Sequence, residues 1–177
     1  KYAEHGDINR KAWEDDVRFA QLEEQWPEII RRQRELDGRP CLTINKLAGM
    51  IRQVVNDARQ NKPGIIVHPA DDKADPETAE IFNGLIRNIE QSSNAEVAYD
   101  TALEHAVTGG FGYFRINTAY TSDDTFEQDI VIERIANPLS VYPDCYSTAA
   151  DSADWDGCFV TDTMSKAAFE KKYKGAD

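Results

Sequence analysis

The stretch Gly109-Gly110-Phe111-Gly112-Tyr113-Phe114-Arg115 marks the point where the hydrophobic pattern of the chain changes. Before it, apolar residues recur at offsets of three and four, which is the spacing of one face of an α-helix. After it, residues 113–120 and 129–135 alternate or run in β-branched and aromatic side chains, with a polar stretch at 121–124 between them. This second pattern predicts a β-hairpin. Helices followed by an antiparallel sheet, without alternating βαβ units, predict an α+β fold.

Six helices are predicted from apolar spacing and from the residues at their ends. Asn45 is expected to cap the third, and Asp75-Pro76 starts the fourth, because a capping carboxylate precedes a first-turn proline. Val54 and Phe82 lie on the two strongest apolar faces, so we expect both to be buried. The predicted helices cover 9–24, 28–36, a stretch after Asn45 that includes 47–58, a stretch after Asp75 that includes 79–89, 95–107, and the residues after Ser165.

Three short strands are predicted besides the hairpin. Gly64 to Val67 is a β-branched run between a Pro-Gly breaker and Pro69, and it is expected to form a buried strand. Residues 140–142 and 158–161 are expected to form strands on either side of an acidic loop. With 177 residues and 41% hydrophobic content, the chain can bury one core. We expect a helical amino-terminal segment over residues 1–40 and an α+β domain over residues 41–177.

Charge and composition disfavour several classes of partner and environment. Thirty-two acidic residues against twenty basic ones give a formal net charge of -12, which disfavours tight contact with phosphate backbones. No apolar run approaches the length that crosses a bilayer, and no leader precedes the first helix. Cys41, Cys145 and Cys158 are odd in number and widely spaced, which fits neither a disulfide framework nor a zinc site and indicates a reducing, cytosolic origin.

The glycines at 109–112 and two groups of aspartates resemble parts of binding sites, but the residues around them do not complete such a site. The glycines at 109–112 lack the Lys-Ser or Lys-Thr of a phosphate loop, and they follow a helix instead of opening one, so a helix stop is the better interpretation. The acidic groups Asp71, Asp72 and Asp75, and Asp151, Asp154 and Asp156, are candidates for a divalent ion. Neither completes a calcium-loop pattern, and hydrated loop acids that also cap helices are the favoured alternative.

The remaining candidates are histidines and arginines. His5, His68 and His105 are isolated in sequence, which favours packed or hydrogen-bonded imidazoles over catalysis. Arg31, Arg32, Arg34 and Arg39 form the one basic concentration, but acidic residues lie among them. A charge-balanced solvent face is favoured there, and contact with phosphate or an acidic neighbouring subunit is the alternative. No catalytic, cofactor-binding or metal-binding residue is therefore assigned.

A set of longer phrases resembles the portal proteins of short-tailed, headful-packaging bacteriophages. The similarity extends over roughly residues 13–173 and is densest between residues 42 and 142. It is carried by Leu42-Thr43-Ile44-Asn45-Lys46, Gln53-Val54-Val55-Asn56-Asp57-Ala58-Arg59-Gln60-Asn61, Pro63-Gly64-Ile65-Ile66-Val67-His68-Pro69, Thr78-Ala79-Glu80-Ile81, Gly84-Leu85-Ile86-Arg87-Asn88-Ile89-Glu90, Ala98-Tyr99-Asp100, the 109–115 stretch quoted above, and Asn137-Pro138-Leu139-Ser140-Val141-Tyr142.

The resemblance implies a structural role in a phage or prophage. It implies a longer protein that forms a dodecameric ring at one capsid vertex, where the genome is packaged and later ejected, with terminase, capsid and tail or adaptor proteins as partners. The virion, and the host cytoplasm during assembly, are the implied locations. This sequence resembles the amino-terminal wing region of that protein, without its stem or clip.

Two other function classes stay open at this point. An acidic adaptor or regulatory module would bind protein partners without forming rings. A metal-dependent enzyme that uses the acidic loops would lose structure or activity on chelation. Because like charges repel and the resemblance omits the stem, we expect these 177 residues alone to be monomeric, or weakly associated, in dilute solution.

Overall fold

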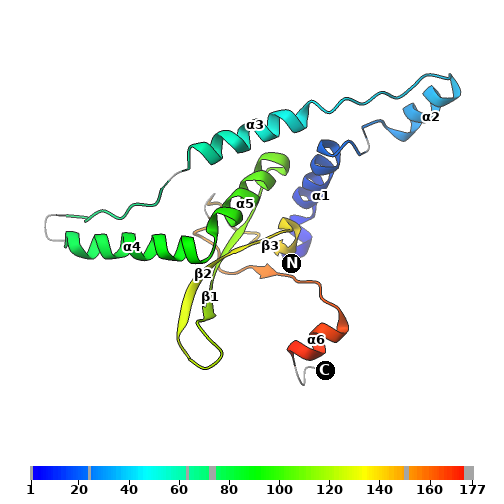
Figure 1. The fold of residues 1–177 in the computed structure, drawn as a ribbon. Coiled ribbons are helices and arrows are strands. Elements are labelled where there is room, and N and C mark those ends of the chain that lie inside the picture. Colours follow the sequence, from blue (N-terminus) through cyan, green and yellow to red (C-terminus); the bar gives the residue numbers. More distant parts are fainter. Residues whose placement is uncertain (1, 24, 63, 72–74, 150–151, 174–177) are drawn as a thin grey trace. The chain divides into compact units, whose positions relative to one another are not determined.

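The computed structural model describes residues 2–23, 25–62, 64–71, 75–149 and 152–173 and confirms the α+β class (Figure 1). The helices come first, and two small antiparallel sheets follow them along the chain. In order, the elements are α1 (Tyr2–Ala20), α2 (Glu28–Leu36), α3 (Leu47–Gln60), α4 (Pro76–Ser92), α5 (Ala95–Gly109), β1 (Phe114–Tyr120), β2 (Gln128–Arg134), a 3-10 turn (Pro138–Ser140), β3 (Val141–Tyr142), β4 (Phe159–Val160) and α6 (Lys166–Lys172).

Contacts along the chain define two units. One comprises residues 11–138, and the other comprises residues 1–10 together with 139–177. Helix α1 contributes residues to both. The predicted division at residue 40 concerns a different boundary and stays a prediction.

The helix starts follow the capping residues in the sequence. The Asp75 carboxylate accepts hydrogen bonds from the backbone N–H groups of Glu77 (3.0 Å) and Thr78 (3.3 Å), as predicted. The Ser165 hydroxyl accepts from the Ala168 N–H at 3.3 Å. Asn45 lies two residues before α3, and its Oδ1 accepts from the Ala48 N–H at 2.9 Å. These side chains satisfy N–H groups that a helix leaves unpaired in its first turn.

The limits of the first helix differ from the prediction. It begins at Tyr2 instead of residue 9, and it ends at Ala20 instead of residue 24. Leu22 lies in the left-handed region with φ 66°, a conformation that stops an α-helix. The predicted spacing is correct within the helix, because Trp13 is buried and Val17 and Ala20 are half-buried.

The core of the larger unit lies where α5 contacts β2. Ala95, Ala98 and Ile132 form a buried cluster, and Ile89 of α4 and Tyr99 of α5 pack against it. The small alanine side chains let the helix approach the hairpin closely. The hairpin pairs in the register Phe114↔Arg134 to Tyr120↔Gln128, so its predicted existence and position are confirmed.

Gly109 and Gly112, in the stretch 109–115, lie so close to neighbouring atoms that a side chain at either position would collide with them. A Cβ added at Gly112 would lie 1.9 Å from the carbonyl oxygen of Ala102, and one added at Gly109 would lie 2.2 Å from the Trp13 ring. Gly110 ends α5 with φ 92°, which confirms the predicted helix stop. This stretch therefore turns the chain from α5 into β1 while holding β1 against the helix.

Two burial predictions are wrong. Val54 is 51% exposed and Phe82 is 50% exposed. Helix α3 contacts α5 through the side that carries Val55, which is 5% exposed. On α4, the buried residue is Ala79 instead of Phe82. The apolar faces exist as the spacing indicates, but the part of the chain that the structure describes covers only one edge of each.

The predicted strand at Gly64 to Val67 is also wrong. These residues are not paired as a strand, and Ile65 and Ile66 are 57% and 63% exposed. The Asn83 side chain of α4 takes the place of a strand partner for one residue. Its Oδ1 accepts from the Val67 N–H at 2.7 Å, and its Nδ2 donates to the Val67 carbonyl at 3.0 Å. A side-chain amide thus satisfies both backbone groups that a ladder would have paired.

The smaller unit contains the two short predicted strands. β3 pairs with β4 in antiparallel fashion, Val141 with Val160 and Tyr142 with Phe159. The Arg10 guanidinium donates to the carbonyls of Leu139 and Val141 and lies over the Tyr142 ring, 4.2 Å from its centroid. This arginine holds the start of the chain against β3.

Candidate functional site

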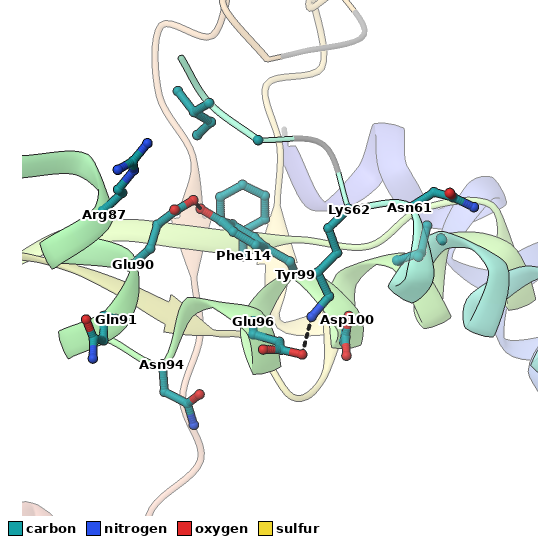
Figure 2. Close-up of a pocket in the computed structure, with 14 residues that line it drawn as sticks. Asn61, Lys62, Arg87, Glu90, Gln91, Asn94, Glu96, Tyr99, Asp100 and Phe114 are labelled. Carbon is teal, nitrogen blue, oxygen red and sulfur yellow. Dashed lines mark hydrogen bonds and ion pairs between the residues drawn. The ribbon is translucent and has the colours of Figure 1, made fainter. Parts of the chain in front are cut away.

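A hollow in the larger unit lies between α3, α4, α5 and the start of β1 (Figure 2). It has a volume of about 1010 Å³ and an apolar floor that includes Tyr99, Leu103 and Phe114. The rings of Tyr99 and Phe114 meet edge to face, with centroids 5.0 Å apart. Such a floor accommodates apolar groups, while the polar side chains at the rim keep the opening hydrated.

Two ion pairs connect the end of α3 to α5 at the edge of this pocket. Lys62, just after α3, pairs with Glu96 of α5, as the dashed line in Figure 2 shows. Arg59 Nε lies 2.8 Å from the Asp100 carboxylate. Hydrogen bonding and charge from Lys62 lower the pKa of Glu96. Both pairs lie on the exposed sides of these elements, and each of these charges has an oppositely charged partner.

Tyr99 is the titratable group in the floor of the pocket. Its hydroxyl donates to Glu90 Oε1 at 3.3 Å. Burial raises the pKa of Tyr99, and the nearby Glu90 charge raises it further. The phenol therefore stays protonated over the whole neutral range, which suits a structural hydrogen bond and opposes a role as a base.

The structure separates the histidines that the sequence offered as candidates. His5 belongs to α1, but its side chain lies outside the described residues, and His68 is exposed after the Ile65-Ile66 segment. His105 is half-buried, and its ring meets Trp13 edge to face at 5.9 Å. Burial lowers the pKa of His105, so the imidazole is neutral at pH 7. This is the packed imidazole that the sequence favoured.

The first acidic group proves to be a helix cap. Asp75 caps α4, and its pKa is lowered by hydrogen bonds from Thr78 and Glu77. Asp71 is exposed, and Asp72 lies outside the described residues. The cap uses the Asp75 carboxylate in the way that the favoured interpretation expects.

The second acidic group orders a loop. Asp154 accepts from the N–H groups of Thr148 (2.6 Å) and Ala149 (3.0 Å) and from the Ser147 hydroxyl (2.7 Å). These bonds lower the pKa of Asp154 to about 2. Asp151 lies outside the described residues, and Asp156 is exposed.

A further acid at this loop was missed in the sequence. Asp144 is 8% exposed and accepts from the N–H groups of Tyr146 (3.0 Å) and Asp156 (3.2 Å). An aspartate that follows a proline at a turn was the available signal. Across the described ranges, no three His, Cys, Asp or Glu side chains gather in a way that could hold a metal ion.

Arg31, Arg32 and Arg34 of the basic concentration lie on α2, and Arg39 follows that helix. Arg32 pairs with Glu28, and Arg31 Nε lies 3.9 Å from Glu35. Arg34 donates to the Pro40 carbonyl and lies over the Trp26 ring. The predicted charge-balanced face is present, and it is solvent-exposed. The three cysteines carry free thiols.

Large apolar side chains are exposed on several elements outside the pocket. They include Leu47 and Met50 of α3, Ile81 and Leu85 of α4, Ile29 and Leu36 of α2, and Ile116 and Tyr120 of β1. Single exposed apolar residues are ordinary, but whole faces of this kind mark interaction surfaces. Within the described residues, every helix is too short or too polar to cross a membrane.

Uncovered apolar faces of this kind are typical of proteins that bind other chains. The chain belongs to the phage P22-like portal protein family, whose model matches residues 1–177. A similar protein is the portal protein of Acyrthosiphon pisum secondary endosymbiont phage 1, which is 29% identical over 138 residues. The match covers 76% of this chain and 19% of that protein, so the chain spans about a fifth of the relative's length.

Proposed function

We propose that this chain is the wing-region part of a portal subunit, and that the whole protein forms a ring at one capsid vertex through which phage DNA is packaged and ejected. The observation that carries the proposal is the family match over every residue of the chain. The portal relative supports it, although the shared region is a small part of that protein. A dodecameric ring, and terminase, capsid and tail or adaptor proteins as partners, follow from the same resemblance.

The exposed surface supports a role inside an assembly. Large apolar side chains are exposed on α2, α3, α4 and β1. Such surface is costly in water, so it favours burial against other chains or against further parts of the same subunit.

The charge suits a DNA conduit. A net charge of -12 opposes lasting contacts with phosphates, and a genome that must slide through a ring needs such a surface. We expect duplex binding at physiological salt to be weaker than the ordinary nonspecific range of about 10⁻⁴ to 10⁻⁶ M. Fluorescence anisotropy with a labelled duplex measures this. A micromolar dissociation constant with a steep salt dependence would contradict the proposal.

The proposed role is structural and needs no catalytic group. Portal rings of this kind leave ATP hydrolysis to the terminase partner, and we expect no ATPase, nuclease or protease turnover from this chain. Turnover that a point change in the Asp71–Asp75 or Asp151–Asp156 loop abolishes would refute this expectation. The virion is the proposed final location, after assembly in the host cytoplasm.

Electron microscopy of a portal-length protein that carries this sequence tests the proposal directly. The expected result is a closed ring with a central channel. Isolated subunits that bind other proteins one to one, with no ring under assembly conditions, would support the adaptor alternative instead.

A further inference from the structure

The outer edge of β1 presents backbone groups that β2 does not bind. The two strands form a sheet by themselves, and the Thr121 N–H donates to the carbonyl of Glu127, directly across the hairpin, at 3.0 Å. Opposite residues of an antiparallel pair alternate between exchanging both hydrogen bonds and exchanging none. The register therefore places the bonded residues of β1 at 115, 117 and 119. The N–H and C=O groups of Ile116, Thr118 and Tyr120 point the other way, and no described residue binds them.

This edge lacks the features that protect exposed strands in other proteins. Such strands are usually short, bulged, covered, or interrupted by lysine or proline, because an open edge pairs with other chains. β1 is seven residues long, pairs without a bulge and contains neither lysine nor proline. Its one charged residue, Arg115, is paired with Glu133 across the hairpin. Helices α4 and α5 contact the hairpin mainly through β2, and every residue of β1 is exposed. The edge is therefore open to a further strand.

The side chains along the edge define the pattern of a strand that would fit there. Ile116 and Tyr120 lie on one face of β1 and are 67% and 62% exposed, whereas Asn117 and Ala119 lie on the other face. Side chains alternate along a strand, and neighbours on the same face contact each other across the ladder. A strand beside β1 should therefore carry aliphatic residues at every second position and polar residues between them.

The hairpin tip adds a charge requirement at one end of this strand. Residues 121–129 contain Asp123, Asp124, Glu127 and Asp129 and no basic residue, and all of them are exposed. An acidic residue beside the tip would be repelled, whereas a lysine or arginine would be attracted. The added strand should therefore be basic where it passes the tip.

The rest of a portal-length subunit is the source that the observations favour. The match to the portal relative covers 19% of that protein, which leaves about four-fifths of its length outside the match. A newly made subunit whose edge stayed open would be prone to pair with other chains before any ring existed. A strand of the same subunit covers the edge from the start, because the connecting chain keeps it at high effective concentration.

We propose that a strand from the part of the portal-length subunit outside residues 1–177 pairs with the outer edge of β1 before the ring forms. It binds the outward N–H and C=O groups of Ile116, Thr118 and Tyr120, and its basic end lies beside the acidic tip. The hairpin is then the edge of a larger sheet. The inference rests on the proposed function, because the longer subunit supplies the strand.

Hydrogen–deuterium exchange at single-residue resolution tests the proposal, because the added strand would protect alternate residues. In the 177-residue chain, the amides of Asn117 and Ala119 should exchange slowly, and those of Ile116, Thr118 and Tyr120 at least about tenfold faster. In the unassembled portal-length subunit, isolated by size exclusion, all five amides should exchange slowly. Contact through side chains alone would not produce this alternation.

A proline substitution separates the added strand from the hairpin itself. Thr118→Pro removes an N–H that the hairpin does not use, and proline is tolerated on an edge strand. In the 177-residue chain, Asn117 and Ala119 should stay slow. In the portal-length subunit, the same change should restore fast exchange at Ile116 and Tyr120.

A charge variant tests the basic end of the strand and does not depend on the proline variant. Asp123→Lys combined with Asp124→Lys repels a basic residue at the tip, so exchange at Tyr120 in the portal-length subunit should rise at least about tenfold. Glu77→Lys combined with Glu80→Lys on α4 changes the net charge by the same amount. This control should leave exchange at Tyr120 unchanged, and an equal rise in the control would contradict the proposed basic end.

Fast exchange at Ile116, Thr118 and Tyr120 in the unassembled subunit would overturn the proposal. Slow exchange that appears only on ring formation would assign the strand to a neighbouring copy, and slow exchange only after another virion protein is added would assign it to that protein. Slow exchange in the 177-residue chain would mean that this chain already covers the edge. Each of these results opposes the proposal without bearing on the proposed function, because electron microscopy of the same protein shows separately whether a ring forms.

Discussion

Helices α5 and α3 contact each other but bury different kinds of surface. α5 buries Ala95, Ala98 and Ala102, and their small side chains bring the helix backbone close to the hairpin. α3 has a broad face of large apolar side chains, yet Val55 is its one fully buried residue among those described. The comparison shows that strong amphipathicity indicates where a helix can be covered, whereas small residues indicate where it is covered within this chain.

The largest expected effect comes from emptying the core beneath α5. Ile132→Ala removes a side chain that is 8% exposed and packed against Ala95 and Ala98, so unfolding should become easier by about 2–5 kcal/mol. Ile116, its partner across the hairpin, is 67% exposed. Ile116→Ala should cost well under half as much. Urea unfolding followed by circular dichroism measures both, and equal losses would mean that Ile116 on β1 is covered as fully as Ile132 on β2.

A second test compares two glycines. Gly112→Ala places a methyl group against the Ala102 carbonyl, a backbone atom that cannot move aside, and should destabilise by about 1–3 kcal/mol. Gly84 lies in α4 with open space around it. Gly84→Ala should therefore stabilise by about 0.5–1 kcal/mol, because alanine is the better helix former. The same denaturation series measures both, and a destabilising Gly84→Ala would show that α4 is covered at this point.

The same contrast explains what the sequence could predict. The helix starts at Asp75 and Ser165, the helix stop at Gly110 and the hairpin depend on local chemistry, and all were predicted correctly. The burial of Phe82 and the strand at Gly64 to Val67 depend on partners. Within the described residues Phe82 stays 50% exposed, and Val67 pairs with the Asn83 side chain instead of with a strand. Hydrophobic spacing identifies a face that can be covered, but it does not say whether the cover comes from the same chain.

The candidate site shows the same limit. Spacing gave correct roles to Asp75 and His105, because a cap and a packed imidazole need only near neighbours. The Arg59–Asp100 and Lys62–Glu96 pairs join residues far apart in sequence, and no local pattern indicates them. Asp144 needed knowledge of the fold around its loop, although its turn position offered a weak signal.

His105 gives a smaller and pH-dependent effect on the packed region. Burial lowers its pKa below the ordinary value of 6.5, so the unfolded chain binds the proton more readily than the folded chain. Stability should therefore fall as the pH drops below about 6.5, and the loss should level off below the folded pKa. Unfolding at a series of pH values, with His105→Gln as the control, measures this. An unchanged slope in the control would assign the effect to other groups.

The smallest expected effect is confined to the 144–156 loop, where an exposed acid holds backbone N–H groups. The pKa of Asp154 is about 2, well below its ordinary value of 3.8, because Thr148, Ser147 and Ala149 donate to the carboxylate. A lowered pKa means that its contribution is complete above pH 3.8 and disappears as the pH falls through about 2. The amide resonances of Thr148 and Ala149 should therefore stay constant down to about pH 3 and shift together with a midpoint near pH 2. Asp154→Asn should abolish that joint shift while leaving the α5 core intact, and a transition near pH 4 in the unchanged chain would show that the loop is not held by this carboxylate.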